Sequence, residues 1–384
     1  MPRTEAFALG LIILAFLVLG VPFAQAEQSQ EKYQDIEVLL VANSKVGTIS
    51  VIDAKDHEKL CCINVIPDIE ERRQDWSIPH RFVNWYAGTI YADDLAVSPD
   101  GKILYVSRGS LSDVAAFDLE SGALLWRVPV ERYRADHMAL SPDGKRIFIS
   151  AIISKRVQII DTMERKTIGA FETASRPHGI KFSPDGKYAL VGTMKGSNIT
   201  IADANTFEVI NRFQFEEGVR PFALTKDGAL LYLQISNFHG FLEYDLTNRK
   251  LLKKISLPET DKSRSYNGNY PKHAAHHGIV LSADGSHLCI AGTSSNYVAL
   301  VKRPELSLED LIPVGDQPNW AINSRDGRYC YVSSRGSNTV SVISYQEKKE
   351  LRRIEVGNYP QRMVVASLPK LSCSPNSASH DKTE

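Results

Sequence analysis

The 384-residue sequence lacks several features that would point directly to a function. Lys and Arg total 45 and Asp and Glu total 45, so the formal net charge is zero. Without an excess of positive charge there is no global field to attract nucleic acid. The chain contains no Cys-x-x-Cys-His motif for attaching c-type haem and no Gly-x-Ser-x-Gly elbow of serine hydrolases. We therefore expect no nucleic-acid partner and no covalently bound cofactor.

Long hydrophobic runs are absent from all but the N-terminus. Arg3 precedes an apolar stretch from Ala6 to Ala24, and Ala24-Gln25-Ala26 provides a small-residue cleavage pattern. Residues 1–26 are therefore predicted to be a secretory signal peptide, the alternative being an uncleaved membrane anchor. We expect an exported protein, in a periplasm or an organelle lumen, with no membrane span in the mature chain. Residues 368–384 have few large apolar groups, which predicts a flexible tail.

A four-residue phrase recurs along the chain and predicts the architecture. Ser-Pro-Asp-Gly begins at Ser98, Ser141 and Ser183, and degenerate copies begin at Thr225, Ser282 and Ser324, so the intervals are 43, 42, 42, 57 and 42. Each copy lies among four short β-rich runs separated by turn residues, and no long helical periodicity is present. A period in the low forties is the length of one four-stranded propeller blade. The fold class is therefore all-β.

The two ends of the repeat region predict a closed ring. Three strand-like runs between residues 38 and 65 have no innermost strand before them, whereas residues 360–366 form one strand with nothing after it. The C-terminal strand should complete the N-terminal blade, which gives a seven-bladed β-propeller over residues 38–367 after a lead-in at 27–37. Closure also removes exposed sheet edges. Insertions at 66–92 and 259–276 should project from one face, where recognition usually resides.

The run Tyr331-Val332-Ser333-Ser334, with Asn338 to Ile343 after it, resembles the YVTN-repeat β-propellers. The resemblance covers about residues 38–366. This group includes surface-layer proteins, lactonase-like proteins and propeller subunits of periplasmic redox complexes. The resemblance implies the fold, but a fold alone does not choose among these functions.

Five cysteines are present, and two of them allow a disulfide between neighbouring blades. Cys289 lies seven residues after Ser282 and Cys330 lies six after Ser324, so their side chains point to opposite faces of their own sheets. Opposite faces of stacked blades can face each other, so the pair forms either a disulfide or two buried small apolar groups. Cys61 or Cys62 could pair with Cys373.

Most of the histidines should gather at one mouth of the central channel. His57 and His287 are expected at the face of the Asp-Gly turns, whereas seven others precede inner strands or lie in loops of the opposite face. The residue five positions before each turn phrase is polar, and Arg362 occupies the matching position in the closing blade. The predicted ligand-binding or partner-binding residues are Asp93, Asp136, His137, His178, Arg220, His276, His277 and Asn319, with Trp85 and Tyr266 from the insertions. Catalytic residues are not identified.

Three interpretations of this mouth stay open. In the first, the polar residues line a water-filled channel, as is usual in propellers. In the second, the insertions supply aromatic anchors for a partner or ligand. In the third, His137, His178 and His277 hold a metal ion, since imidazole and carboxylate ligands suit Zn or Cu. The loops Ser107-Arg108-Gly109-Ser110 and Ser334-Arg335-Gly336-Ser337 are interpreted as turns.

We expect a non-haem scaffold or recognition subunit of an extracytoplasmic redox complex, whose partners include haem-containing subunits. In this respect the chain resembles the propeller subunits of hydrazine synthase (its β subunit) and of quinohaemoprotein amine dehydrogenase. An accessory subunit of an oxidoreductase is expected rather than a chain that is catalytic on its own. The alternatives are a metal-dependent or lactonase-like enzyme and a small-molecule-binding protein, both using the His-rich mouth.

Overall fold

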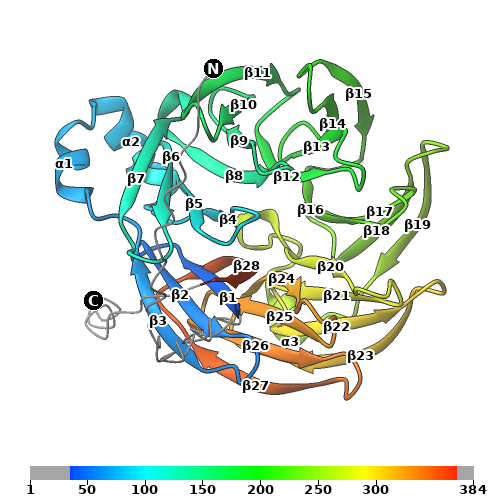
Figure 1. The fold of residues 1–384 in the computed structure, drawn as a ribbon. Coiled ribbons are helices and arrows are strands. Elements are labelled where there is room, and N and C mark those ends of the chain that lie inside the picture. Colours follow the sequence, from blue (N-terminus) through cyan, green and yellow to red (C-terminus); the bar gives the residue numbers. More distant parts are fainter. Residues whose placement is uncertain (1–34, 370–384) are drawn as a thin grey trace, which may run out of the picture. The chain divides into compact units, whose positions relative to one another are not determined.

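Seven four-stranded antiparallel sheets form a ring in the computed structural model, which describes residues 35–369 (Figure 1). The predicted seven-bladed β-propeller is confirmed. The predicted signal peptide, most of the lead-in, and the tail from residue 370 lie outside the described residues. None of the helices within residues 35–369 has the length and apolar composition that crossing a membrane requires.

Each blade is a meander whose first strand lies nearest the centre of the ring. The first three blades, from the inner to the outer strand, are β28 (Pro360–Leu368), β1 (Ile36–Asn43), β2 (Thr48–Asp53) and β3 (Lys59–Asn64); β4 (Asp94–Val97), β5 (Ile103–Arg108), β6 (Asp113–Asp118) and β7 (Leu124–Pro129); β8 (Ala135–Leu140), β9 (Arg146–Ala151), β10 (Arg156–Asp161) and β11 (Lys166–Glu172).

The remaining four blades repeat this order. They are β12 (Pro177–Phe182), β13 (Tyr188–Thr193), β14 (Asn198–Asp203) and β15 (Val209–Gln214); β16 (Val219–Leu224), β17 (Leu230–Ile235), β18 (Gly240–Asp245) and β19 (Lys250–Ser256); β20 (Ile279–Leu281), β21 (His287–Gly292), β22 (Tyr297–Lys302) and β23 (Ser307–Pro313); β24 (Pro318–Asn323), β25 (Tyr329–Ser334), β26 (Thr339–Ser344) and β27 (Lys349–Glu355).

The recurring phrase builds the turn between the first and second strands of a blade. In the first copy the Ser98 hydroxyl donates to Asp100 Oδ1 at 2.5 Å, and the same hydroxyl accepts the Ile103 N–H at 2.9 Å. Gly101 closes the turn at a φ of 71°, a left-handed conformation that glycine adopts without steric cost. The degenerate copy at Thr225 makes the same bonds, so the pattern depends on a hydroxyl and a carboxylate two residues apart.

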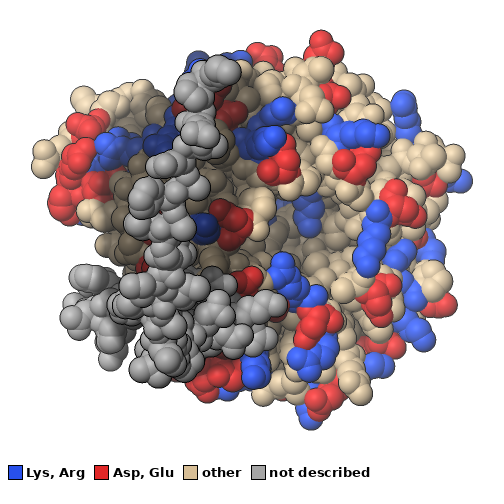
Figure 2. Space-filling model, viewed as in Figure 1, with Lys and Arg blue, Asp and Glu red and all other residues tan. Residues whose placement is uncertain are grey.

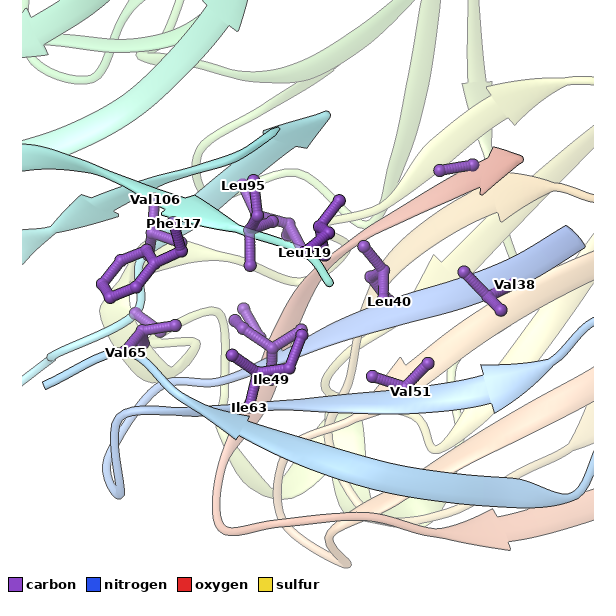
Figure 3. Close-up of a cluster of buried hydrophobic side chains, with 14 of the residues drawn as sticks. Val38, Leu40, Ile49, Val51, Ile63, Val65, Leu95, Val106, Phe117 and Leu119 are labelled. Atoms are coloured by element: carbon purple, nitrogen blue, oxygen red, sulfur yellow. The ribbon is translucent and has the colours of Figure 1, made fainter. Parts of the chain in front are cut away.

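The C-terminal strand closes the ring. β28 pairs with β1 in antiparallel register, Leu40 opposite Val364 and Val38 opposite Ala366, and so supplies the inner strand of the N-terminal blade. Seven buried hydrophobic clusters follow, one at each interface between neighbouring blades. Figure 3 shows the cluster in which Val38, Leu40 and Ile49 of the first blade pack against Phe117 and Leu119 of the second.

Between residues 35 and 369, helices occur only in the connections between strands. The long segment between β3 and β4 contains α1 (Ile69–Gln74) and α2 (Ile78–Ala87), and the segment between β19 and β20 contains α3 (Asp261–Ser265). Short 3-10 turns cover Gly109–Leu111, Glu131–Tyr133 and Pro271–His273. In Figure 1, α1 and α2 project beyond the ring of blades beside β7.

Cys289 of β21 and Cys330 of β25 form a disulfide between two neighbouring blades. Both side chains are fully buried in the hydrophobic cluster at that interface. Cys62 is buried with its Sγ 3.7 Å from the Ser50 hydroxyl, and the predicted pairing that involves Cys373 lies outside the described residues.

The disulfide should stabilise the ring. Replacing Cys289 and Cys330 together by Ala preserves apolar packing but releases two residues that are 41 apart in sequence. The unfolded chain then gains conformational freedom, so the free energy of unfolding should fall by about 3 kcal/mol. Urea denaturation of the double variant and of the oxidised and reduced wild type measures this. Equal midpoints for all three would contradict the prediction.

Candidate functional site at the channel mouth

Five inner strands carry a bulge at the same level, close to one mouth of the channel. In each, the inner strand has one residue more than its partner strand. The shifts fall between Ala135 and Met138, Pro177 and Ile180, Val219 and Phe222, Pro318 and Trp320, and Pro360 and Met363. A bulge ends the regular pairing and redirects side chains. The residues inside these bulges include Asp136, His137, His178, Arg220 and Arg362.

Hydroxyl groups from the preceding blade hold the backbone of these bulges. The Ser107 hydroxyl donates to the carbonyl of Asp136 at 2.6 Å, and the Ser150 hydroxyl donates to the carbonyl of His178 at 3.0 Å. Each hydroxyl comes from a second strand, so neighbouring blades fix the position of each other's site residues. The side chains at the mouth therefore rest on rigid strands, which favours a preorganised site.

A cavity of 710 Å³ lies at this mouth. Six of the predicted residues line it: Asp93, Asp136, His137, His178, Arg220 and His277. All six are buried to more than nine-tenths of their surface. A mostly buried set of carboxylates, imidazoles and a guanidinium around one cavity is typical of a small-molecule site.

Asp136 orients His178. The His178 ring places Nδ1 at 3.1 Å from Asp136 Oδ1, and because a carboxylate accepts, Nδ1 carries the proton. The other ring nitrogen, Nε2, is buried and has no hydrogen-bond partner. An imidazole whose Nδ1–H is held by a carboxylate can use an unprotonated Nε2 to accept a proton or bind a ligand.

Two further histidines lie beside this pair. His277 Nδ1 is 3.1 Å from the carbonyl of Asn319, so its Nε2 is also the unprotonated nitrogen of a neutral ring. The His137 ring lies 3.9 Å from the His178 ring, centroid to centroid. His137 Nδ1 accepts from Arg362, so the proton of its neutral ring is on Nε2, 3.5 Å from Asp136 Oδ1. Burial, together with nearby Arg and His charges, holds the pKa values of His137 and His277 well below the usual range.

The two carboxyl groups of the cavity differ in acidity. Burial is the largest cause, and the negative charge of Asp136 the second, that raises the pKa of Asp93 to about 7. Burial alone would also raise the pKa of Asp136, but the charge and hydrogen bond of His178 and the charge of Arg134 hold it below its ordinary value. Asp136 is therefore the ionised partner of His178, whereas Asp93 is partly protonated at neutral pH.

Basic side chains form another part of the wall. Burial and the charge of Arg335 lower the pKa of Arg220 to about 10, so the Arg220 guanidinium remains charged near neutrality. The Arg220 Nε donates to the Ser236 hydroxyl at 3.0 Å, which fixes its orientation. Two buried guanidinium groups at one cavity favour a bound anion.

Asp136, His137 and His178 also place three potential metal-ligating atoms within 4.8 Å of one another. The anchored Nδ1–H of His178 is the arrangement found in metal-binding histidines. However, His137 Nδ1 already accepts from Arg362, and the charges of Arg220 and Arg362 act on the neighbouring rings. These positive charges disfavour a cation, so the donor set fits a metal ion less well than an anion.

Four predicted residues do not line the cavity. His276 is buried beside His239 and places Nε2 at 3.2 Å from the Tyr297 hydroxyl, so it supports the 259–276 insertion. Asn319 contributes its carbonyl to His277 rather than its side chain. Trp85 is exposed on α2, and Tyr266 ends α3 beside Tyr270.

Two arginines were interpreted from sequence as parts of turns. Arg335 does follow β25 in a turn, but its side chain lines the cavity. Arg108 is the last residue of β5, fully buried, and binds Asp68 and Asp113. The sequence signal for both arginines was a charged residue flanked by Ser and Gly at the end of the second strand of a blade. The cavity lining further contains Arg134, Arg176, Lys195, Glu217 and His273.

His57 and His287 lie at the face of the Asp-Gly turns, as predicted. His57 contacts Tyr329 and Tyr331, and His287 is hydrogen-bonded to Ser286 beside the turn of Asp284. His380 lies outside the described residues.

Figure 2 shows positive and negative side chains interspersed over the visible face, without a large area of one sign.

Residues 161–355, half of the chain, match the protein family described as Lactonase, 7-bladed beta-propeller. The chain belongs to this lactonase family. The narrower resemblance to YVTN-repeat propellers stays a prediction. No curated protein matches the chain.

Many solved structures share the fold of this lactonase-family chain, and two of them illustrate the likeness. Hydrazine synthase from Kuenenia stuttgartiensis is 17% identical with a TM-score of 0.60, and the match covers 72% of this chain and 95% of the other. A protein described as a 6-phosphogluconolactonase from Bacteroides fragilis is 17% identical with a TM-score of 0.65, and the match covers 87% and 99%. At this identity the likeness shows the fold alone.

The raised pKa of Asp93 predicts a pH dependence of stability. The unfolded chain releases this proton near the ordinary value of 3.8, whereas the folded chain keeps it until about 7. The unfolded state therefore binds fewer protons between these values, and stability contributed by this group falls as the pH rises from about 4 to about 7. Asp93→Asn removes the effect.

The check is the melting temperature of wild type and Asp93→Asn at about pH 5 and about pH 8. The variant should gain stability relative to wild type at the higher pH. A difference that does not change with pH would show that Asp93 titrates normally.

Proposed function

We propose that the mouth cavity binds a small anionic molecule and that His178 activates water there for hydrolysis of a lactone. The observation that carries this proposal is that His178, whose Nδ1 is held by Asp136 and whose Nε2 has no hydrogen-bond partner, lines the same cavity as Arg220 and Arg335. Membership of the lactonase family supports the reaction class. The proposal makes the chain an enzyme, which the sequence left as an alternative.

The reaction needs a base, an attacking water and stabilisation of negative charge. His178 Nε2 takes a proton from water while the water oxygen attacks the lactone carbonyl carbon. Asp136 stabilises the imidazolium that forms, because its carboxylate accepts from Nδ1. The ring C–O bond then breaks, and the alkoxide leaving group takes the proton from His178. The balance is one lactone and one water to one hydroxy acid.

The charge of the cavity supports an anionic substrate. Its lining contains five basic side chains, Arg134, Arg176, Lys195, Arg220 and Arg335, against three acidic ones, Asp93, Asp136 and Glu217. The pKa of about 7 leaves Asp93 partly neutral near pH 7, which increases the positive excess. A guanidinium pair suits a carboxylate or phosphate group and the oxyanion of the transition state.

The test is a panel of lactones with and without a carboxylate or phosphate group. His178→Asn should lower kcat by roughly 10²–10⁴-fold, because it removes the proton acceptor. Arg335→Met should raise KM for the anionic lactones more than for neutral ones. His287→Gln, at the opposite face, is the matched control.

Three results would overturn the proposal. They are the absence of hydrolysis across the panel, equal rates for wild type and His178→Asn, and loss of activity on chelation with a stoichiometric metal found by elemental analysis. The last result would instead establish the metal-dependent alternative at Asp136, His137 and His178.

A second candidate function is the exported non-haem recognition subunit expected from the sequence, with haem-containing partners. The specific observation in its favour is an apolar helix face on the 66–92 insertion, with no counterpart in the blade repeats. This candidate requires a protein partner but no chemistry in the cavity, so the two functions are independent.

A further inference from the structure

Helix α2 exposes its apolar side to solvent and buries its polar side. Its large apolar side chains point to solvent, with exposures of 84% for Ile78, 60% for Phe82, 78% for Trp85 and 79% for Tyr86. Its buried residues are the polar His80 and Asn84. A surface helix normally buries its apolar side and exposes its polar side. The four side chains, here called the α2 face, therefore have no packing role within the described residues.

Polar anchors hold the helix in this orientation. His80 Nε2 is 2.8 Å and Asn84 Nδ2 is 3.1 Å from the carbonyl of Ser110, in the 3-10 turn that follows β5. The carbonyl accepts both bonds, so the inner side of α2 is fixed to the second blade. The His80 ring also stacks on Tyr133 at 5.4 Å.

A buried ion network fixes the segment that leads into the helix. Arg108, fully buried, donates to Asp68 at 2.5 Å and to Asp113 at 2.7 Å, and Arg127 also binds Asp68. Removing one partner would leave a buried charge, so the network strongly favours a single position of the insertion. The α2 face is thus presented rigidly, which lowers the entropic cost of binding.

The size of the α2 face limits what can cover it. Since a large apolar or aromatic side chain exposes roughly 150–250 Å² when free, the four together expose about 600 Å². This is at the upper limit of the apolar patches that monomers expose. It is well below the area that obligate dimers bury on each subunit, about 1,000 Å² or more, but it matches one side of a transient complex. The area favours a transient protein partner over a stable second copy.

Charge argues against a lipid surface. The 66–92 insertion has four acidic and three basic residues, so it offers no positive excess to an anionic membrane. Phe82 and Trp85 contact each other at 5.8 Å, and Phe82 stacks on Tyr86 at 6.3 Å, which forms one continuous aromatic ridge. Spacings of four, seven and eight residues from Ile78 are those of a helix that docks in a groove.

We propose that the α2 face docks into an apolar groove of a second, different protein in a transient complex. Tyr86 lies on the α2 face and also lines the mouth cavity, so the docked partner covers part of the rim of that cavity. This inference deepens the second candidate function by naming its docking surface and does not depend on hydrolysis at His178.

The experiment uses a photo-crosslinking amino acid at position 82 of the full chain in its source cells, with the same amino acid at Met163 as the control. Met163 is 80% exposed and lies between β10 and β11, far from α2 in the sequence. A single adduct of defined mass should form at position 82 and not at 163. The partner found by mass spectrometry is then purified and titrated against the full chain.

Trp85→Ser should weaken this purified complex by at least about thirtyfold, because exposed aromatic anchors dominate such interfaces. His178→Asn should bind the partner as wild type does, which separates docking from hydrolysis. An adduct of twice the chain mass would overturn the proposal in favour of a second copy. Trp85-dependent flotation with phosphatidylcholine–phosphatidylserine vesicles would overturn it in favour of a membrane. No adduct, or equal affinity of Trp85→Ser, would also overturn it.

Discussion

The pairing of β28 with β1 is the constraint on which the rest of the structure depends. A blade cannot bury its own two faces, because a four-stranded sheet must pack against a neighbour on each side. Each of the seven hydrophobic clusters is therefore shared by two blades. Without the pairing of Leu40 with Val364, the first blade would lose its inner strand and two clusters would open. Closure thus couples residues that are more than three hundred positions apart.

Closure also creates the mouth cavity. Arg362 arrives on β28 and meets His137, which comes from the third blade. Convergence of inner strands from different blades removes water from the carboxyl and imidazole groups, and this desolvation shifts the pKa values of Asp93, His137 and His277. The bulges and the hydroxyl clamps then decide which side chains enter the cavity. A repeated scaffold thereby yields a site to which the third, fourth and fifth blades contribute the different side chains of Asp136, His178 and Arg220.

The 66–92 insertion follows a different physical logic. Helices α1 and α2 are held to the second blade by hydrogen bonds and ion pairs, centred on Arg108 and the Ser110 carbonyl, and the large apolar residues of α2 face solvent. Polar anchoring gives the helix one orientation, because hydrogen bonds are directional and hydrophobic contact is not. The mouth cavity and the α2 face share Tyr86, but the other residues proposed for each function are separate. Either function can therefore exist without the other.

Much of the fold follows from local sequence. The hydroxyl, carboxylate and glycine of each turn phrase make their bonds within six residues, and their spacing sets the length of a blade. The unpaired strands at the two ends of the repeats predict closure. The same alignment predicts that Asp136, His178, Arg220 and His277 meet at one mouth, because equivalent positions of a ring converge.

Other features were decided by the tertiary structure. His276 is adjacent to His277 yet faces Tyr297, and Trp85 turns away from the cavity that Tyr86 lines. Arg335 lies in a turn, as its neighbours suggest, but enters the cavity. The disulfide between Cys289 and Cys330 required the relative orientation of two sheets. In each case the direction of a side chain depends on bulges and on packing against residues distant in sequence, whereas the repeat is encoded by neighbours.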